Sequence, residues 1–390
     1  MTIVVTGGGS GGHITPILAV ASELKRLRPD VRIIYVGQKG DKLADIPAGH
    51  PSIDATYTVR AGKFRRYHGE GWKQLFRLST QLKNARDAVF VLMGIWQSFW
   101  LLRKVKPQII FTRGGFVSVP VAIGGYLNHV PYITHDSDSI PSLANRIIGG
   151  KAILHAVARA PETYPYPLDR TVNMGIPLSE HYVPVTPTLQ RSYRQELGFD
   201  SYEQMIFITG GGNGADKLNT IIADNMPYLL RKYPNMVVVH VAGRAMEQAL
   251  TQAYDSLVTD TSQRQRIVVK GFIGDLYRYS GAADLIICRG GATNLAEFAL
   301  QGKPCIVIPA KQLVWNVRNV QSLADQQAVV QMDEDQSAQE RRLAATISEL
   351  LDDNDRRTKL GLRLHKFAQP DAAQRLAELL LKTAGETSKT

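Results

Sequence analysis

The sequence predicts an α/β fold made of two doubly wound, Rossmann-like domains. The length of 390 residues suits two domains of ordinary size. Short apolar runs alternate with helical patterns, and glycine-rich loops follow several of these runs. A content of 44% hydrophobic and 21% charged residues excludes a disordered or multi-span protein. The two cysteines, Cys288 and Cys305, lie in apolar runs, so a disulfide framework is excluded and a reducing cytoplasm fits.

The first half of the chain predicts a parallel sheet with helices on both faces. Ile3–Thr6 is an apolar strand, and Ile14–Leu27 has the spacing of a helix. Ligands of open α/β sheets bind beyond the carboxyl ends of the strands, so the loops after the strands should line one cleft. Three more buried strands are expected, at Ile33–Gly37, Ile109–Thr112 and Tyr132–His135.

A proline-rich stretch from Pro177 to Pro187 predicts a linker to a second α/β pattern. We therefore expect domains at residues 1–180 and 188–352, followed by a C-terminal helix in residues 353–390 whose tail frays from Thr383. The strands expected in the second domain are Met205–Thr209, Val237–Ala242, Ile267–Lys270, Leu285–Cys288 and Cys305–Ile308.

The formal charge of +11 predicts an anionic partner. Residues 60–106 hold eleven basic side chains against two acidic ones, and they enclose the most apolar run of the chain, Val89–Leu102. These fourteen residues are too few to cross a bilayer, which needs about 20. Cations beside aromatic rings favour a peripheral contact with an anionic membrane over nucleic acid, and a buried amphipathic helix with a solvated face is the alternative. The membrane contact is assigned to Lys63, Arg65, Arg66, Phe90, Trp96, Phe99 and Trp100.

The first glycine loop, Gly7–His13, joins a strand to a helix, so its backbone N–H groups form an anion site. Its glycines also satisfy the G-x-G-x-x-G pattern of dinucleotide-binding dehydrogenases. That class requires an acidic residue at the end of the next strand, where this chain has Gly37 and Gln38 and where Asp41 comes late. The pattern therefore disfavours a dehydrogenase.

Two more glycine loops follow strands of the second half. They are Thr209–Ala215 and Arg289–Thr293, and the latter leads into a helix that carries Glu297. Three such loops exceed what one dinucleotide needs. They suit a diphosphate ligand that is approached from both sides, with glycosyl transfer at its end.

These loops belong to an ordered series of motifs that resembles the MurG family of glycosyltransferases. The resemblance extends over residues 1–330. Its motifs, in chain order, are Gly7–His13 with Pro16, Gly114–Pro120, His135–Asp138, Pro141–Arg146, the second glycine loop with Leu218 and Asn219, Ala283–Thr293, Ala296, Glu297, Gly302 and Pro304.

The resemblance implies the GT-B fold, in which two Rossmann-like domains face a central cleft. The C-terminal domain then binds UDP-N-acetylglucosamine. The N-terminal domain binds a polyprenyl-pyrophosphate-linked N-acetylmuramyl-peptide at the cytoplasmic face of the membrane. The implied reaction is an inverting transfer that converts lipid I to lipid II in peptidoglycan synthesis, without a metal or cofactor. The alternatives are another UDP-sugar-dependent lipid glycosyltransferase, a UDP-sugar epimerase of related fold, and a non-catalytic nucleotide-binding protein.

The resemblance also implies the site residues. His13, Asp136 and Asp138 are the catalytic candidates. Asp136 and Asp138 also form a D-x-D, the metal signature of a different transferase fold, which we take as coincidence. The substrate-binding candidates are Gly9, Ser10, Gly11, Gly12, Gly114, Gly115, Asn145, Gly211, Gly212, Asn213, Gly214, Phe272, Ile273, Gly291, Ala292, Thr293, Glu297, Asn316 and Asn319.

Each main candidate also has a purely structural interpretation. His13 is either a base for the acceptor hydroxyl or a helix cap. Glu297 either accepts both ribose hydroxyls or is a surface acid favoured by the helix dipole. Phe272 and Ile273 either bind uracil through their backbone or pack in the core.

The chain departs from the family pattern at two places. The segment Gly175–Ser179 lacks the basic residue that follows Gly-x-Pro in the family, which predicts the loss of one phosphate contact. After Pro309 the family has a His- or Gln-rich loop, whereas this chain has Lys311, Gln312 and Trp315. N-acetylglucosamine as the donor sugar therefore follows from the family and not from these residues.

Overall fold

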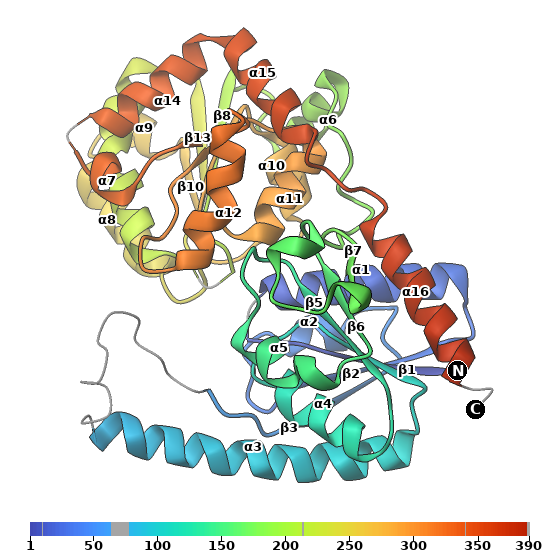
Figure 1. Cartoon of the computed structure of the whole chain (residues 1–390). Helices are drawn as coiled ribbons and strands as arrows, with labels where there is room; N and C mark the ends of the chain where they lie inside the picture. Colours follow the sequence, from blue (N-terminus) through green and yellow to red (C-terminus); the bar gives the residue numbers. More distant parts are fainter. Residues whose placement is uncertain (10, 64–77, 213, 340, 388–390) are drawn as a thin grey trace. The chain divides into compact units, whose positions relative to one another are not determined.

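The computed structural model describes residues 1–9, 11–63, 78–212, 214–339 and 341–387. It divides into two compact units (Figure 1). Unit 1 contains Met1–Ser179 and Pro370–Thr390, and unit 2 contains Glu180–Gln369. Each unit is a parallel sheet with helices on both faces, which confirms the predicted doubly wound α/β class.

Unit 1 has, within the described residues, a seven-stranded sheet of order β3-β2-β1-β4-β5-β6-β7. All its pairings are parallel. The strand order reverses between β1 and β4, where Thr6 lies opposite Thr112. In doubly wound sheets, ligands bind at this switch point. The strands are β1 Thr2–Thr6, β2 Arg32–Gln38, β3 Ala55–Val59, β4 Ile109–Thr112, β5 Tyr132–Asp136, β6 Leu154–Val157 and β7 Thr171–Asn173.

Helices bury both faces of the unit 1 sheet, which explains why its central strands are continuously apolar. One face packs against α1 and α16, and the other packs against α3 and α4. The helices are α1 Gly11–Leu27, α2 Asp45–Ala48, α3 Leu78–Val105, α4 Ser118–Leu127, α5 Leu143–Ile148 and α16 Ala372–Thr387, with 3₁₀ turns at Gly149–Lys151, Pro161–Thr163 and Leu168–Arg170.

Unit 2 repeats this plan with a six-stranded parallel sheet, among the described residues, of order β10-β9-β8-β11-β12-β13. Its switch point lies between β8 and β11, where Thr209 is opposite Cys288. The strands are β8 Gln204–Thr209, β9 Met236–Val241, β10 Ile267–Lys270, β11 Leu285–Cys288, β12 Cys305–Val307 and β13 Val330–Gln331.

The helices of unit 2 bury two clusters of apolar side chains, one on each face of the sheet. One cluster includes side chains of α7, α8 and α14, and the other includes side chains of α6, α11 and α12. The helices are α6 Pro187–Leu197, α7 Asp216–Lys232, α8 Glu247–Leu257, α9 Thr261–Arg264, α10 Leu276–Ala282, α11 Ala292–Gln301, α12 Val314–Asp325, α13 Glu334–Ser337, α14 Arg342–Asp352 and α15 Asn354–His365.

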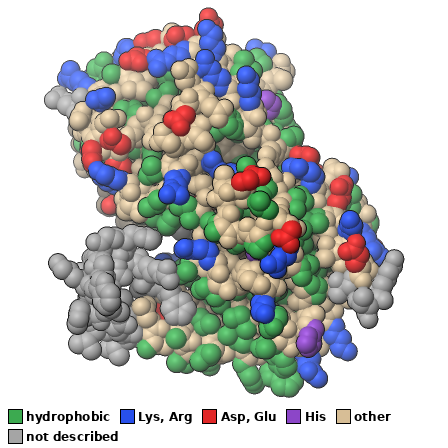
Figure 2. Space-filling model, viewed as in Figure 1, with side chains coloured by type: hydrophobic (Ala, Val, Ile, Leu, Met, Phe, Trp, Pro, Cys, Tyr) green, Lys and Arg blue, Asp and Glu red, His purple; other side chains and the backbone are tan. Residues whose placement is uncertain are grey.

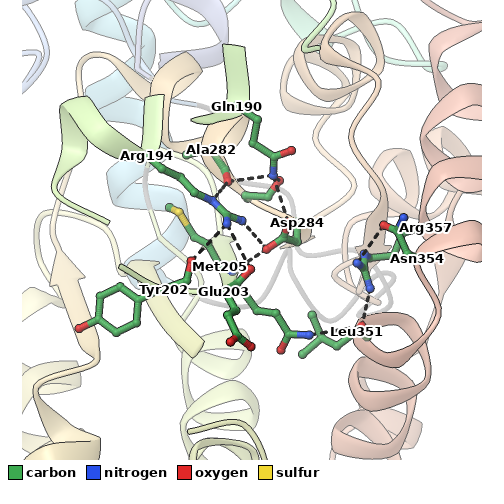
Figure 3. Close-up of polar contacts among 12 residues, drawn as sticks. Gln190, Arg194, Tyr202, Glu203, Met205, Ala282, Asp284, Leu351, Asn354 and Arg357 are labelled. Atoms are coloured by element: carbon green, nitrogen blue, oxygen red, sulfur yellow. Dashed lines mark hydrogen bonds and ion pairs between the residues drawn. The ribbon is translucent and has the colours of Figure 1, made fainter. Parts of the chain in front are cut away.

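A polar cluster joins α6 to the amino ends of β8 and β11 (Figure 3). Arg194 of α6 pairs with Asp284 at 2.5 Å and donates to the Ala282 carbonyl at 3.0 Å. The Asp284 carboxylate also accepts hydrogen bonds from Met205 N at 2.7 Å and Gln190 Nε2 at 3.1 Å. Asp284 is one of the motif residues, but it lies at the sheet edge opposite the glycine loops and stabilises the fold.

The predicted strands are confirmed to within one residue at each end. Four short strands were not predicted: β3, β6, β7 and β13. The side chains of β3 alternate between half-buried and exposed, apart from the buried last one, and the other three strands have four residues or fewer. None of them gives a continuous apolar run.

The prediction of one helix with a frayed tail in residues 353–390 is wrong. This segment forms α15 in unit 2 and α16 in unit 1. Pro370 lies between them, and proline cannot continue a helix because it lacks an N–H donor. The tail from Thr383 is helical to Thr387, since Ala384 is fully buried in the core with α1.

Candidate functional site

The carboxyl ends of β1 and β4 bring two glycine loops together in unit 1. Gly115 has φ +84°, and a Cβ on it would lie 3.0 Å from the Gly8 carbonyl oxygen. Gly9 and Gly114 also have positive φ, at +81° and +80°. Because this conformation and this close approach favour residues without a Cβ, the switch point is lined by backbone. Such a surface admits a phosphate group close to the N–H donors.

The first of these loops binds a carboxylate of the protein itself. Gly9 N donates to Asp41 Oδ2 at 2.8 Å, and Leu43 N donates to Asp41 Oδ1 at 3.0 Å. Gly11 and Gly12 then open α1. The loop therefore already presents an N–H group to an anionic oxygen, as an anion site requires.

His13 is half-buried in the first turn of α1, with its Nδ1 3.0 Å from the Arg113 carbonyl oxygen. A carbonyl oxygen accepts only, so Nδ1 carries the proton and Nε2 keeps its lone pair. Burial and the nearby Arg113 cation lower the pKa of His13 from 6.5 to about 4. At neutral pH the ring is therefore uncharged, and its free nitrogen can accept a proton.

The side chain of Arg113, the residue whose carbonyl contacts His13, joins the start of α1 to the end of β5 and the loop after it. Its buried guanidinium donates to the Gly12 carbonyl at 2.9 Å and also contacts Ser137 Oγ and His135 Nδ1. Burial lowers the pKa of Arg113 to about 10, so the group stays charged at neutral pH. His135 donates its other ring nitrogen to the Gly175 carbonyl at 2.8 Å and is the neutral partner of this cation.

Asp136 is buried at the end of β5, whereas Asp138 is half-buried in the loop that follows. The Asp136 carboxylate accepts hydrogen bonds from Ser142 N at 3.0 Å and Tyr166 Oη at 2.8 Å. Burial raises its pKa to about 6. The Asp138 carbonyl accepts from Tyr164 Oη at 3.0 Å. The contacts of Asp136 hold this loop against the start of α5.

Three of the predicted asparagines are buried, and two of them, one in each unit, hold backbone carbonyls. In unit 1, Asn145 Nδ2 donates to the His135 carbonyl at 2.9 Å. In unit 2, Asn319 Nδ2 donates to the Gly290 carbonyl at 3.0 Å, and Asn316 is buried one turn earlier on α12. Asn145 and Asn319 therefore support the loops from behind, and a direct substrate contact remains a prediction.

In unit 2 the second glycine loop follows β8. Gly211 and Gly214 have φ +87° and +74°, and Gly212 between them is exposed. A Cβ on Gly211 would lie 3.8 Å from Asn294 Oδ1, and Gly214 packs against the Ala242 carbonyl after β9. The loop thus lies between the end of β9 and the first turn of α11.

The third glycine loop ends at α11. Gly291 precedes this helix, and no side chain among the described residues caps it there. Ala292 and Thr293 form the first turn. The first N–H groups of a helix carry its positive dipole end, so this turn is a second anion site at the same sheet edge.

Glu297 is on the second turn of α11 and is 6% exposed, which contradicts the surface-acid interpretation. Its carboxylate accepts from Asn294 Nδ2 at 2.8 Å and from the hydroxyl of Tyr182. Burial raises the pKa of Glu297 from 4.5 to about 7. A carboxylate with spare lone pairs in this position can accept both hydroxyls of a ribose.

The loops after β9 and β10 complete this edge. The Arg244 guanidinium carbon lies 4.5 Å from the centroid of the half-buried Phe272 ring. Ile273 is 8% exposed, and its side chain belongs to the core as the structural interpretation proposed. A uracil contact through the backbone of these two residues stays a prediction.

In the described part of the chain, no group of three or more His, Cys, Asp or Glu side chains can hold a metal ion. The D-x-D pair does not change this, because Asp136 directs its carboxylate to Ser142 and Tyr166. Four predicted site residues fall outside the described residues: Ser10, Asn213, Arg65 and Arg66.

The four aromatic residues of the predicted membrane contact are on α3. Trp96 and Trp100 are 67% and 52% exposed, whereas Phe90 and Phe99 are half-buried. Lys63 is exposed, with its Nζ 5.5 Å from the Phe116 ring centroid. Figure 2 shows hydrophobic side chains gathered along the lower edge of unit 1, where Figure 1 draws α3. The exposed apolar side chains on this helix are Val89, Leu92, Met93, Trp96 and Trp100.

The helix that carries the apolar run Val89–Leu102 is longer than the run itself. Within α3, the 22 residues Asn84–Val105 are long and apolar enough to span a bilayer by length and composition. The apolar run ends where polar residues begin, whereas the helix continues through those polar residues on both sides. One side of α3 nevertheless packs on unit 1, because Asp87, Ser98 and Leu102 are buried and Gly94 abuts the Arg60 carbonyl.

Residues 3–153 match the glycosyltransferase family 28 N-terminal domain, and residues 205–376 match the corresponding C-terminal domain. A UDP-N-acetylglucosamine--N-acetylmuramyl-(pentapeptide) pyrophosphoryl-undecaprenol N-acetylglucosamine transferase of Geobacillus thermodenitrificans is 31% identical over 389 residues. The match covers 98% of this chain and 99% of that relative. The chain belongs to the MurG family. A transferase of the same name, numbered 3, from Bacillus thuringiensis is 34% identical over 311 residues, covering 79% of this chain and 78% of the relative.

Solved structures agree with the GT-B fold expected for the MurG family. The crystal structure of Acinetobacter baumannii MurG matches with a TM-score of 0.67 and 21% identity, covering 98% of this chain and 99% of that one. A UDP-GlcNAc 2-epimerase from Neisseria meningitidis, bound to UDP-GlcNAc, matches with a TM-score of 0.65 and 14% identity over 98% and 100%. The epimerase alternative therefore has support from the fold alone.

Three residues of this MurG-family chain that shape the sites were not predicted: Asp41, Arg113 and Tyr182. Arg113 had a visible signal, since it is a charged residue between an apolar strand and a glycine motif. Asp41 comes too late for the dehydrogenase pattern, and its sequence position gave no indication that it binds the first glycine loop. Tyr182 lies between the segment Gly175–Ser179 and α6, and its sequence position gave no signal of a partner 115 positions away.

Proposed function

We propose that this MurG-family protein transfers N-acetylglucosamine from UDP-N-acetylglucosamine to a polyprenyl-pyrophosphate-linked N-acetylmuramyl-peptide. The product is lipid II of peptidoglycan synthesis. The observation that carries the proposal is a backbone-lined anion site at the switch point of each sheet, in a chain of this family. One such site in each unit matches a reaction whose donor and acceptor are both diphosphates.

Unit 2 takes the UDP-sugar in this proposal. The diphosphate binds at Gly211–Gly214 and at the start of α11, formed by Gly291–Thr293. Glu297 accepts the ribose hydroxyls, and the backbone of Phe272 and Ile273 meets the uracil. The helix N-terminus and the loop N–H groups stabilise the charge on the leaving diphosphate, a role that a divalent cation has in other transferases.

Unit 1 takes the lipid-linked acceptor and supplies the base. The acceptor hydroxyl oxygen attacks the anomeric carbon while His13 Nε2 removes its proton. The bond from that carbon to the diphosphate oxygen breaks, and UDP leaves with the electron pair, which inverts the anomeric centre. An acceptor diphosphate beside the first loop raises the pKa of His13 from about 4 toward the working pH. Asp138 binds an acceptor hydroxyl, and Asp136 holds the loop in place.

The membrane assignment rests on α3. Its exposed tryptophans, Trp96 and Trp100, lie on the side opposite the residues that pack on unit 1. An amphipathic helix with this arrangement lies in the interface plane and does not cross the bilayer. The enzyme is therefore peripheral on the anionic cytoplasmic leaflet, where its polyprenyl acceptor resides, and it has no nucleic-acid partner.

Radiolabelled UDP-N-acetylglucosamine tests the reaction. Incubated with and without a lipid pyrophosphoryl-muramyl acceptor, the protein should place label in the lipid product only when the acceptor is present. UDP-glucose in parallel tests the donor sugar. Release of free sugar, or conversion of the donor to an isomer without acceptor, would contradict the proposal, and the second result would favour an epimerase.

Sedimentation with vesicles tests the membrane contact. Trp96→Asp should reduce binding to vesicles that contain anionic lipid. A matched control is Leu362→Asp, which alters a side chain of similar exposure, 61% against 67%, in unit 2. High salt should weaken binding of the unaltered protein, because the screening length falls from about 8 Å at physiological ionic strength to about 3 Å at 1 M and the basic segment is then attracted less to the lipid. If the two variants bound the vesicles equally, α3 would not be part of the membrane interface.

A further inference from the structure

Tyr182 precedes α6 and reaches the carboxylate of Glu297 with its hydroxyl. Its ring is fixed by edge-to-face packing on Tyr277, with centroids 6.2 Å apart. Tyr277 is itself held by His181 at 5.0 Å and by Tyr193 at 6.0 Å. The aromatic cluster therefore determines where the Tyr182 hydroxyl points.

Glu297 receives its hydrogen bonds from neutral groups. Asn294 Nδ2 donates to one carboxylate oxygen at 2.8 Å, and the Tyr182 hydroxyl is the second side-chain donor. A buried carboxylate without donors takes up a proton, because burial disfavours the charged form. Two donors occupy half of the roughly four lone-pair positions of a carboxylate, which leaves acceptors for a diol.

We propose that Tyr182 is a positioning residue of the nucleotide site: its hydroxyl, together with the Asn294 amide, favours the charged form of the Glu297 carboxylate and aims it at a ribose diol. The inference deepens the proposed function and rests on the assignment of the nucleotide to unit 2. Tyr182 comes shortly after Gly175–Ser179, the segment that lacks the family's basic residue.

Titration of the full-length protein with UDP at pH 6, 7 and 8.5 tests the role of Tyr182. Tyr182→Phe removes the hydroxyl and keeps the ring on Tyr277. We expect its dissociation constant for UDP to rise about tenfold at pH 7, the size of effect of one lost hydrogen bond to a charged group. The rise should be smaller at pH 8.5, because loss of the donor raises the pKa of Glu297 and high pH restores the carboxylate.

Tyr193→Phe is the matched control, since its ring packs on the same Tyr277 and the donors to Glu297 are Asn294 and Tyr182. It should bind UDP normally at every pH. Asn294→Ala removes the other donor and should repeat the pH-dependent loss, so the inference stays testable if Tyr182→Phe folds poorly.

A loss of affinity that is equal at all three pH values would overturn the positioning role and leave Tyr182 as a packing residue. Unchanged or tighter UDP binding by Tyr182→Phe would overturn it too. Glu297→Gln separates this failure from failure of the proposed function. If Glu297→Gln binds UDP as well as the unaltered protein does, the nucleotide site itself is misassigned.

Discussion

Replacing Glu297 with glutamine should stabilise unit 2 at neutral and alkaline pH while it weakens UDP binding. The carboxyl group is 6% exposed, and burial raises its pKa from 4.5 to about 7. A group whose pKa is raised by folding contributes stability that is complete below its unfolded value and is lost as the pH rises through the folded value. Glutamine has the same shape and stays neutral, so the variant avoids this loss.

The size of the expected gain in unfolding free energy follows from the change in the pKa of Glu297. A rise from 4.5 to about 7 corresponds to roughly 3 kcal/mol, at about 1.4 kcal/mol for each pH unit. Relative to the unaltered protein, the variant should gain about 1 kcal/mol near pH 5 and about 3 kcal/mol near pH 8. For a domain of the size of unit 2, the larger gain corresponds to a rise of roughly 6–12 °C in melting temperature.

Calorimetric unfolding of both proteins at pH 5 and pH 8 measures this gain, because contributions of the other titrating groups cancel in the difference. Titration with UDP should show a loss of about 1–3 kcal/mol in binding. A gain that is the same at both pH values would refute the titration of Glu297 near neutrality. Lower stability of the variant at pH 8 would refute the argument from burial.

Three further predictions concern separate parts of the molecule. His13→Ala should lower kcat by about 10²–10⁴, as loss of a general base does, with UDP affinity unchanged; initial rates and calorimetry check this, and a retained rate would exclude the base. Asp284→Ala should destabilise unit 2 by about 3 kcal/mol in chemical unfolding, because Arg194 loses its partner, and unaltered stability would contradict this. Transfer activity should survive EDTA, and rescue of lost activity by magnesium would make Asp136 and Asp138 a metal site.

The strands were predictable wherever both faces of the sheet are covered. Residues 3–5 and 109–111 are fully buried and read as uninterrupted apolar runs. β3 lies at the edge of its sheet with alternating exposure, so its run Ala55–Val59 mixes small and polar residues. β6 carries His155, which is buried because Thr134 Oγ1 hydrogen-bonds its Nδ1 at 2.8 Å. A polar residue whose hydrogen bond is made inside the protein can lie in a buried strand, and it interrupts the apolar run by which such a strand is predicted.

The glycine loops were predictable because they depend on backbone geometry that a short motif encodes. The side chains around them depend on contacts between distant parts of the chain. Asp41 reaches Gly9 across 32 positions, and Arg113 meets His13 across 100. The folded sheet creates both contacts by bringing neighbouring strand ends together. Sequence spacing therefore locates an anion site but not the groups that set its charge.

Burial favours the neutral forms of both His13 and Glu297, but the groups beside them act in opposite directions. In unit 1, burial and the nearby Arg113 cation keep His13 neutral, which a proton acceptor requires. In unit 2, burial raises the pKa of Glu297 to about 7, and the neutral donors Tyr182 and Asn294 limit this rise, which favours the charged form that accepts two hydroxyls. Removing the cation should thus affect the pH dependence of transfer, whereas removing a neutral donor should affect that of UDP binding. In this MurG-family chain, different residues therefore set the pH dependence of the transfer step and the pH dependence of UDP binding.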